Sequence, residues 1–126
     1  MAFDERLAAR VRRALGERTD FSERRMFGGV AFMVRGHMCC GLVKDDLMVR
    51  VGRDAFPDAV SRPHARPMDF TGRPSAGMVY VAPAGLKTQR ALTAWIDRGL
   101  AYIRSLPPRP IRPRKLGLPR ALRPRQ

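Results

Sequence analysis

The chain has 126 residues, of which 44% are hydrophobic, and this suits one domain with a buried core. Its formal net charge is +14 and its pI is about 11.6. Such a positive charge favours binding to polyanions such as nucleic acid, an anionic membrane or an acidic protein. No apolar stretch approaches the ~20 residues that a membrane-spanning helix needs, and no secretory signal opens the sequence. The two cysteines are adjacent and cannot build a disulfide framework, so we expect a protein of the reducing cytoplasm.

Three segments have the apolar spacing and end signals of helices. Residues 4–15 begin with two acids, which suit the positive end of a helix, and then repeat apolar residues at helical spacing. Residues 54–61 predict a shorter helix with Asp54 as its cap. Residues 88–106 carry a long apolar stripe that includes Trp95, and prolines end it. Core packing explains this stripe better than a cofactor contact.

The strands are predicted in two groups. Residues 25–52 have the pattern of a three-stranded meander with tight connections at residues 35–36 and 45–46. Residues 68–71 are expected to pair with residues 78–81. The predicted order is therefore α-βββ-α-ββ-α. This is an α+β fold, a two-layer sandwich in which helices cover one face of an antiparallel sheet.

The two turns also predict which face of the sheet each side chain occupies, because neighbouring strand residues point to opposite sides. The face expected beneath the helices is apolar throughout: Ala31, Met33, Met38, Cys40, Leu42, Val49 and Val51. The opposite face is predicted to be open and to bind a partner or a second copy through Val30, Phe32, Val34, His37, Cys39, Met48 and Arg50. A shift of one residue in the pairing would exchange the two sets. The alternative is that the proline-rich loop or the C-terminal segment covers this face.

The adjacent cysteines are the strongest candidates for chemistry. In a regular strand Cys39 and Cys40 point to opposite faces, so only His37 shares a side with Cys39. Two ligands are fewer than zinc sites use, and a strand lacks the cationic setting that activates a thiol. Asp45 and Asp46 fit turn chemistry better than acid–base catalysis. We therefore predict no catalytic residue, no metal and no cofactor.

A basic tail over residues 107–126 is expected to follow the domain at residues 1–106. It holds six of the 11 prolines, seven of the 25 Lys and Arg residues and none of the 11 acids, so it carries half of the net charge. Repeated proline favours extended chain, and we expect disorder. Contacts to nucleic-acid phosphates are predicted for Arg109, Arg112, Arg114, Lys115, Arg120, Arg123 and Arg125. The alternative is a solubilising tail without a dedicated partner.

Three stretches together resemble a known family. They are "RRMFGGVAFMVRGHMCCGLVKDDLMVRVG", "PHARPMDFTGRPSAGMVYVAP" and "LTAWIDRGLAYIRSLPP". The sequence over roughly residues 3–107 is similar to the N-terminal domain of the TfoX/Sxy family of competence regulators. The resemblance implies a small bacterial α+β domain without enzymatic activity, which assists a cyclic-AMP receptor protein at competence promoters. The regulators continue into a helical C-terminal domain, whereas the basic tail stands at that place here.

Two functions are consistent with these observations. The first is a transcription-associated adaptor whose body docks a protein partner, such as a cyclic-AMP receptor-like regulator, while the tail contacts DNA. The second is a nonspecific DNA- or RNA-binding protein that acts mainly by charge. No base-reading helix is evident for either. A homodimer through the open face is a further expectation, and no membrane partner is expected.

Overall fold

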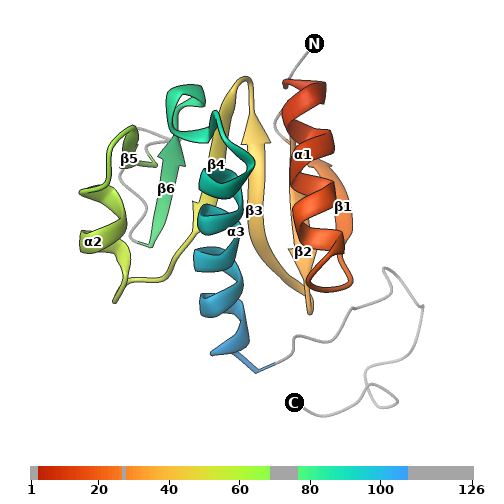
Figure 1. The fold of residues 1–126 in the computed structure, drawn as a ribbon. Helices are drawn as coiled ribbons and strands as arrows, with labels where there is room; N and C mark the ends of the chain where they lie inside the picture. Colours follow the sequence, from red (N-terminus) through yellow and green to blue (C-terminus); the bar gives the residue numbers. More distant parts are fainter. Residues whose placement is uncertain (1–2, 27, 69–76, 108–126) are drawn as a thin grey trace.

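The chain forms one antiparallel sheet with helices packed against it, and the computed structural model describes residues 3–26, 28–68 and 77–107 (Figure 1). In chain order the elements are α1 (Glu5–Gly16), β1 (Ser22–Met26), β2 (Gly29–Val34), β3 (His37–Val43), β4 (Asp46–Arg50), α2 (Phe56–Val60), β5 (Ala65–Pro67), β6 (Met78–Val81), the 3₁₀ helix η1 (Pro83–Leu86) and α3 (Gln89–Arg104). The strands lie in the order β1-β2-β3-β4-β6-β5 and every neighbouring pair is antiparallel. The predicted α+β fold class is confirmed.

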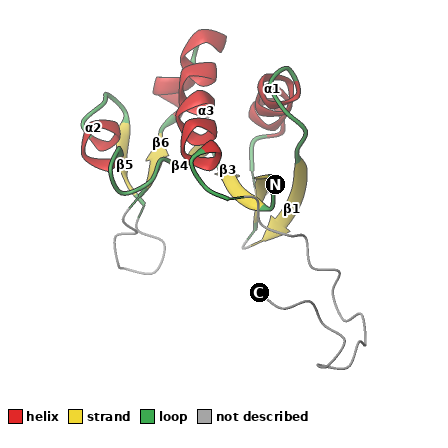
Figure 2. Cartoon of the chain, turned by 90° about the horizontal axis from the view of Figure 1, so that it is seen from below, coloured by secondary structure: helices red, strands yellow, loops and turns green. Residues whose placement is uncertain are grey.

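The helices lie on one side of the sheet. Figure 2 shows α1, α2 and α3 together on that side, with the strands beneath them. The apolar stripes predicted for α1 and α3 are buried: Leu7, Ala8, Val11, Ala14 and Leu15 in α1, and Leu92, Trp95, Ile96, Gly99, Leu100 and Ile103 in α3. They pack against β2, β3, β4 and β6, so the core lies between the helices and one face of the sheet. This arrangement leaves the other face of the sheet without a helix from the described residues.

Local signals account for the ends of the two long helices. The Asp4 side chain caps α1 by accepting hydrogen bonds from the backbone N–H groups of Arg6 and Leu7, at 2.9 and 3.3 Å. The Thr88 hydroxyl accepts from the N–H of Ala91 at 3.0 Å at the start of α3. The short helix α2 differs from the prediction. It begins at Phe56 with no side-chain cap, although Asp54 was expected to supply one.

The sheet contains one strand more than predicted. β1 has the sequence "SERRM" and lacks the apolar alternation that identifies a half-buried strand. Its position is set by pairing with β2 and by an ion pair across to α1, in which the Arg12 guanidinium donates two hydrogen bonds to the Glu23 carboxylate at 2.6 and 3.0 Å. These hydrogen bonds hold the pKa of Glu23 below its ordinary value.

β5 also differs from the prediction, because the partner of β6 is Ala65–Pro67 rather than residues 68–71. Among the described residues one further backbone bond follows, from Met68 N–H to the carbonyl oxygen of Met78 at 3.1 Å. Most of the predicted strand lies outside the described residues. The strand pair itself, antiparallel at the far edge of the sheet, is as expected.

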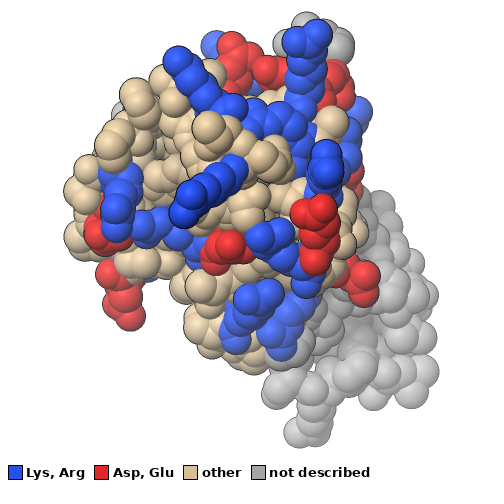
Figure 3. All heavy atoms as spheres, viewed as in Figure 1, with Lys and Arg blue, Asp and Glu red and all other residues tan. Residues whose placement is uncertain are grey.

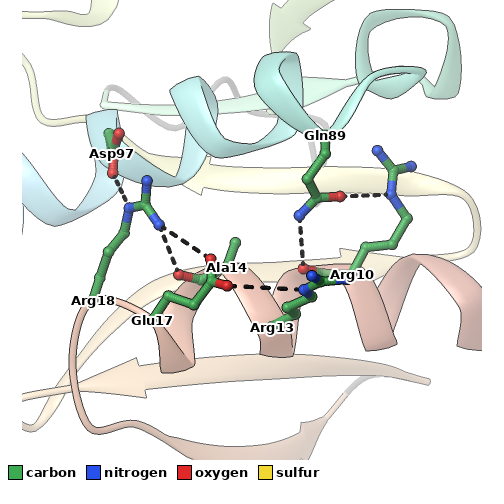
Figure 4. A network of polar contacts seen from close by, with 7 residues as sticks. All are labelled: Arg10, Arg13, Ala14, Glu17, Arg18, Gln89 and Asp97. Carbon is green, nitrogen blue, oxygen red and sulfur yellow. Dashed lines mark hydrogen bonds and ion pairs between the residues drawn. The ribbon is translucent and has the colours of Figure 1, made fainter.

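Polar side chains join α1 to α3 above the core. Arg10 and Gln89 bond to each other at one end, and Arg18 binds the Asp97 carboxylate at 2.6 Å at the other (Figure 4). The Arg18 guanidinium also donates to the carbonyl oxygen of Ala14 at 3.2 Å. These contacts fix the spacing of the two helices, and Lys and Arg side chains spread widely over this helix-covered side (Figure 3).

Candidate functional site

A β-bulge in β3 determines where the two cysteines point. Met33 lies opposite Met38, whereas the residue before it in β2, Phe32, lies opposite Cys40. Cys39 therefore has no opposed residue in β2 and is the extra residue of the bulge. Neither cysteine has any exposed surface, and both belong to the core. The prediction that Cys40 faces inward is therefore confirmed, and the prediction that Cys39 faces outward is wrong. Strict alternation holds only in a strand without a bulge.

The two thiols are enclosed beneath α3. A Cβ atom placed on Gly99 would lie 2.9 Å from the Sγ atom of Cys39 and 3.1 Å from its carbonyl oxygen, so the missing side chain lets the helix approach the bulge. The hydrogen bond that the Cys40 thiol donates to Cys39, and then burial, raise the pKa of the Cys40 thiol well above its ordinary range. A buried, protonated thiol is a poor nucleophile and a poor metal ligand. Among the described residues no group of three His, Cys, Asp or Glu side chains could hold a metal ion.

Four of the seven residues predicted for the open face lie in the core instead: Val30, Phe32, Val34 and Cys39, each no more than 2% exposed. The first turn is as predicted, with Val34 opposite His37. Beyond it, the bulge shifts β2 by one residue relative to the second half of β3. The second turn also occupies residues 44–45 rather than 45–46, since Val43 lies opposite Asp46. The bulge is a shift of one residue and exchanges the two faces of β2. The moved turn shifts the opposed pairs of β3 and β4 by two residues and keeps the faces of β4.

The other three predicted residues separate as well. His37 is half-buried on the side of Val34, and its Nε2 atom lies 2.8 Å from the carbonyl oxygen of Pro107, just after α3. Its Nδ1 atom is buried and has no hydrogen-bond partner in the part of the chain that the structure describes. Met48 and Arg50 alone occupy the side away from the helices, because they alternate with the buried Val49.

The register identifies the true residues of the open side, because directly opposed residues share a face. One complete row crosses the sheet: Arg24, Ala31, Gly41, Met48, Tyr80 and Arg66. A second row adds Met33 opposite Met38 and Arg50 opposite Met78. We call these ten residues the outer face. Sequence reasoning placed Ala31, Met33 and Met38 beneath the helices, whereas the register puts them on the other side, where Ala31 is nevertheless fully buried. It did not select Arg24, Arg66, Met78 or Tyr80.

Methionine dominates the middle of the outer face. Met33, Met38 and Met78 are partly exposed, whereas Met48 is 6% exposed. A Cβ atom on Gly41 would lie 2.9 Å from the Cε atom of Met48, so this thioether lies flat over the glycine. Methionine is unbranched and polarizable, and such side chains adapt to differently shaped partners.

Arginines stand at both edges of the outer face. Arg24 on β1 is exposed and forms no ion pair with any residue that the structure describes. Arg66 on β5 stacks over the ring of Tyr80 at 4.8 Å and binds the Asp46 carboxylate at 2.7 Å. The backbone of Arg50 lies in the same register, but its guanidinium stacks at 5.3 Å over the ring of Tyr102, a residue of α3. The open side is therefore an apolar centre with a cationic border.

The remaining predicted site residues are not part of the outer face. The seven tail residues proposed for nucleic-acid contact, residues 109–125, lie outside the described residues. Asp45 lies in the β3–β4 turn, as turn chemistry predicted, whereas Asp46 is the first residue of β4 and is engaged by Arg66. In the described part of the chain, no helix is long and apolar enough to cross a membrane.

The fold and the open sheet face define a small α+β domain of the half-covered antiparallel type. Comparison with family models gives a match to the TfoX N-terminal domain over residues 13–103, which is most of the described body. The chain belongs to the TfoX N-terminal domain family, as its sequence motifs indicated. No curated protein and no solved structure matches it.

Proposed function

We propose that this chain is a non-enzymatic, transcription-associated adaptor whose folded body docks a protein partner. Membership of a competence-related family supports a place in gene regulation. The observation that carries the proposal is the outer face, where partly exposed methionines lie on a sheet side that has no helix from the described residues. Partly exposed apolar surface of this kind marks interaction sites.

The chemistry of the described residues supports binding rather than catalysis. The two thiols are enclosed, and the pKa of Cys40 is raised, so neither is poised to attack a substrate. The acid beside the β3–β4 turn, Asp46, is held in an ion pair. These three side chains therefore have structural roles that account for them.

A second candidate function is charge-driven binding of DNA or RNA. It is favoured by residues 107–126, which hold seven basic residues and no acid. Seven phosphate contacts would make affinity fall about a thousandfold or more between 50 and 200 mM salt. Deleting residues 107–126 would then abolish most of the binding, as measured by fluorescence anisotropy with a labelled duplex and a labelled RNA.

A pull-down separates the two candidates. The full chain and a chain lacking residues 107–126 are used side by side as baits in nuclease-treated bacterial extract, and purified cyclic-AMP receptor protein is tested in parallel. The adaptor proposal predicts a protein partner that both baits retain. Loss of every partner on nuclease treatment or on deletion of the tail would contradict it and favour the charge-only function.

A further inference from the structure

We infer that the outer face docks an amphipathic helix of another protein whose polar side is acidic. The inference rests on the proposed adaptor function and specifies its partner. A sheet with one apolar face finds stability by burying that face against a further layer, most often of helices. The described helices all lie on the opposite side of this sheet, so a partner's helix would supply the third layer.

The centre of the outer face suits a helix. Ala31 and Gly41 lie side by side in the middle of the sheet and have small or no side chains. The Met48 side chain lies over Gly41. Met33 and Met38 flank Ala31, so both small residues are buried beneath methionines. The accessible surface of this centre is therefore formed by flexible methionine side chains, and a row of Leu, Ile or Met side chains from a helix could pack against them.

The charges of the outer face select an acidic partner. Arg24 and Arg66 stand at the two opposite edges of the sheet, with Arg50 between them. Asp46 is the one carboxylate that the described strands place on this side, and Arg66 already occupies it at 2.7 Å. Carboxylates on the flank of a docked helix that faces β1 would meet Arg24, which has no acidic partner among the described residues, whereas the Arg50 guanidinium stacks on Tyr102 of α3.

The same charges disfavour the other occupants. In a dimer through this face, the edge arginines of one copy would approach those of the other with no free carboxylate to separate them. Residues 107–126 would add seven cations and no acid to a border that is already cationic. An acidic helix is therefore the occupant that complements the surface, and the other two are outcomes of the test.

The test uses an 18-residue, fluorescein-labelled helical peptide with Leu and Met along one side and Glu along the other. A second peptide replaces every Glu with Lys. Because Lys and Arg also cover the helix side of the molecule, a matched pair of charge reversals is needed (Figure 3). Arg24→Glu changes the outer face, and Arg90→Glu makes the same change at the exposed start of α3.

We expect the full chain to bind the Glu peptide and not the Lys peptide in anisotropy titrations. Arg24→Glu should weaken binding about tenfold, and Met38→Glu at least as much, while Arg90→Glu stays within about twofold of the unaltered chain. Thermal melts of the variants show that each one is folded. Equal losses in Arg24→Glu and Arg90→Glu, or no binding of the Glu peptide, would overturn the inference. Dimers that Met38→Glu dissociates would replace it with self-association.

Failure of this inference differs from failure of the adaptor function. If a partner from the pull-down is retained by Arg24→Glu and Met38→Glu, the adaptor function stands and the outer face is not its site. If the peptide binds as expected but no protein partner survives nuclease treatment, the surface is correctly described and the adaptor function is wrong.

Discussion

At the scale of single residues, Gly99 determines how closely α3 approaches the bulge. Its missing side chain leaves room for the Sγ atom and the carbonyl oxygen of Cys39, and a Cβ atom would also lie 3.4 Å from Val49 Cγ1. The carbonyl oxygen belongs to the backbone of a central strand and cannot move aside without disturbing the pairing. The glycine is therefore required by packing, although it lies in the interior of a helix.

Gly99→Ala should lower the free energy of unfolding by about 1–3 kcal/mol, because overpacking outweighs the gain of about 1 kcal/mol in helix propensity. Urea titration measures the change. The exposed Ala94 of the same helix supplies the control, since Ala94→Gly should report propensity alone. A Gly99→Ala variant as stable as the unaltered chain would show that α3 does not lie as close to Cys39 as described.

The raised pKa of Cys40 makes stability depend on alkaline pH. The folded chain holds the thiol proton more tightly than the unfolded chain, whose thiol has the ordinary pKa of 9.0. Its contribution to stability is therefore complete below that pH and is lost as pH rises through the folded pKa. The stability advantage of the unaltered chain over Cys40→Ala should shrink by about 1 kcal/mol between pH 8 and pH 10 in urea titrations. A constant difference would contradict this.

At the scale of elements, the ends of the long helices could be predicted from the sequence, whereas the bulge in β3 could not. The apolar repeats, the acids at the start of α1 and the prolines after α3 predicted both helices within two residues at each end, and the structure adds Asp4 and Thr88 as their caps. The bulge at Cys39 has no such signal, because every residue around it suits a strand. β1 was missed because it is polar and depends on β2 and on Arg12 of α1, which lie elsewhere in the sequence.

The bulge also explains why the candidate surface could be predicted only in part. Reasoning from the turn at residues 35–36 correctly paired Val34 with His37, and correctly placed Cys40, Leu42 and Val49 in the core. It then carried strict alternation across Cys39, and β2 was assigned to the wrong side. The fold class predicts that one face of the sheet is left without helices. Which residues lie on that face depends on the bulge at Cys39 in β3, which the sequence does not signal.

The cap of α1 can be tested by itself. Asp4→Ala removes the acceptor for the N–H groups of Arg6 and Leu7 and should cost about 1 kcal/mol in the free energy of unfolding. Asp4→Asn keeps an acceptor oxygen and should recover most of that loss. Urea titrations of the two variants measure the difference. Equal losses would mean that charge, rather than the two hydrogen bonds, supports the helix end.

At the scale of the whole molecule, the two sides of the sheet have different roles. One side holds the core beneath α1 and α3, and the other presents methionines between arginines. The strongly basic composition would keep copies of this chain apart and attract acidic partners over long range. The central claim is that the contact is then made on the outer face.

Methyl NMR of the full chain, labelled with ¹³C at the methionine methyl groups, tests this claim most directly. The seven methionines give one signal each, assigned by Met→Leu substitutions, and the unlabelled Glu peptide is titrated in. The signals of Met33, Met38, Met48 and Met78 should shift or broaden together, and Arg24→Glu should reduce the effect at equal peptide concentration. Unchanged signals from these four methyl groups, while the peptide is bound elsewhere, would contradict the account.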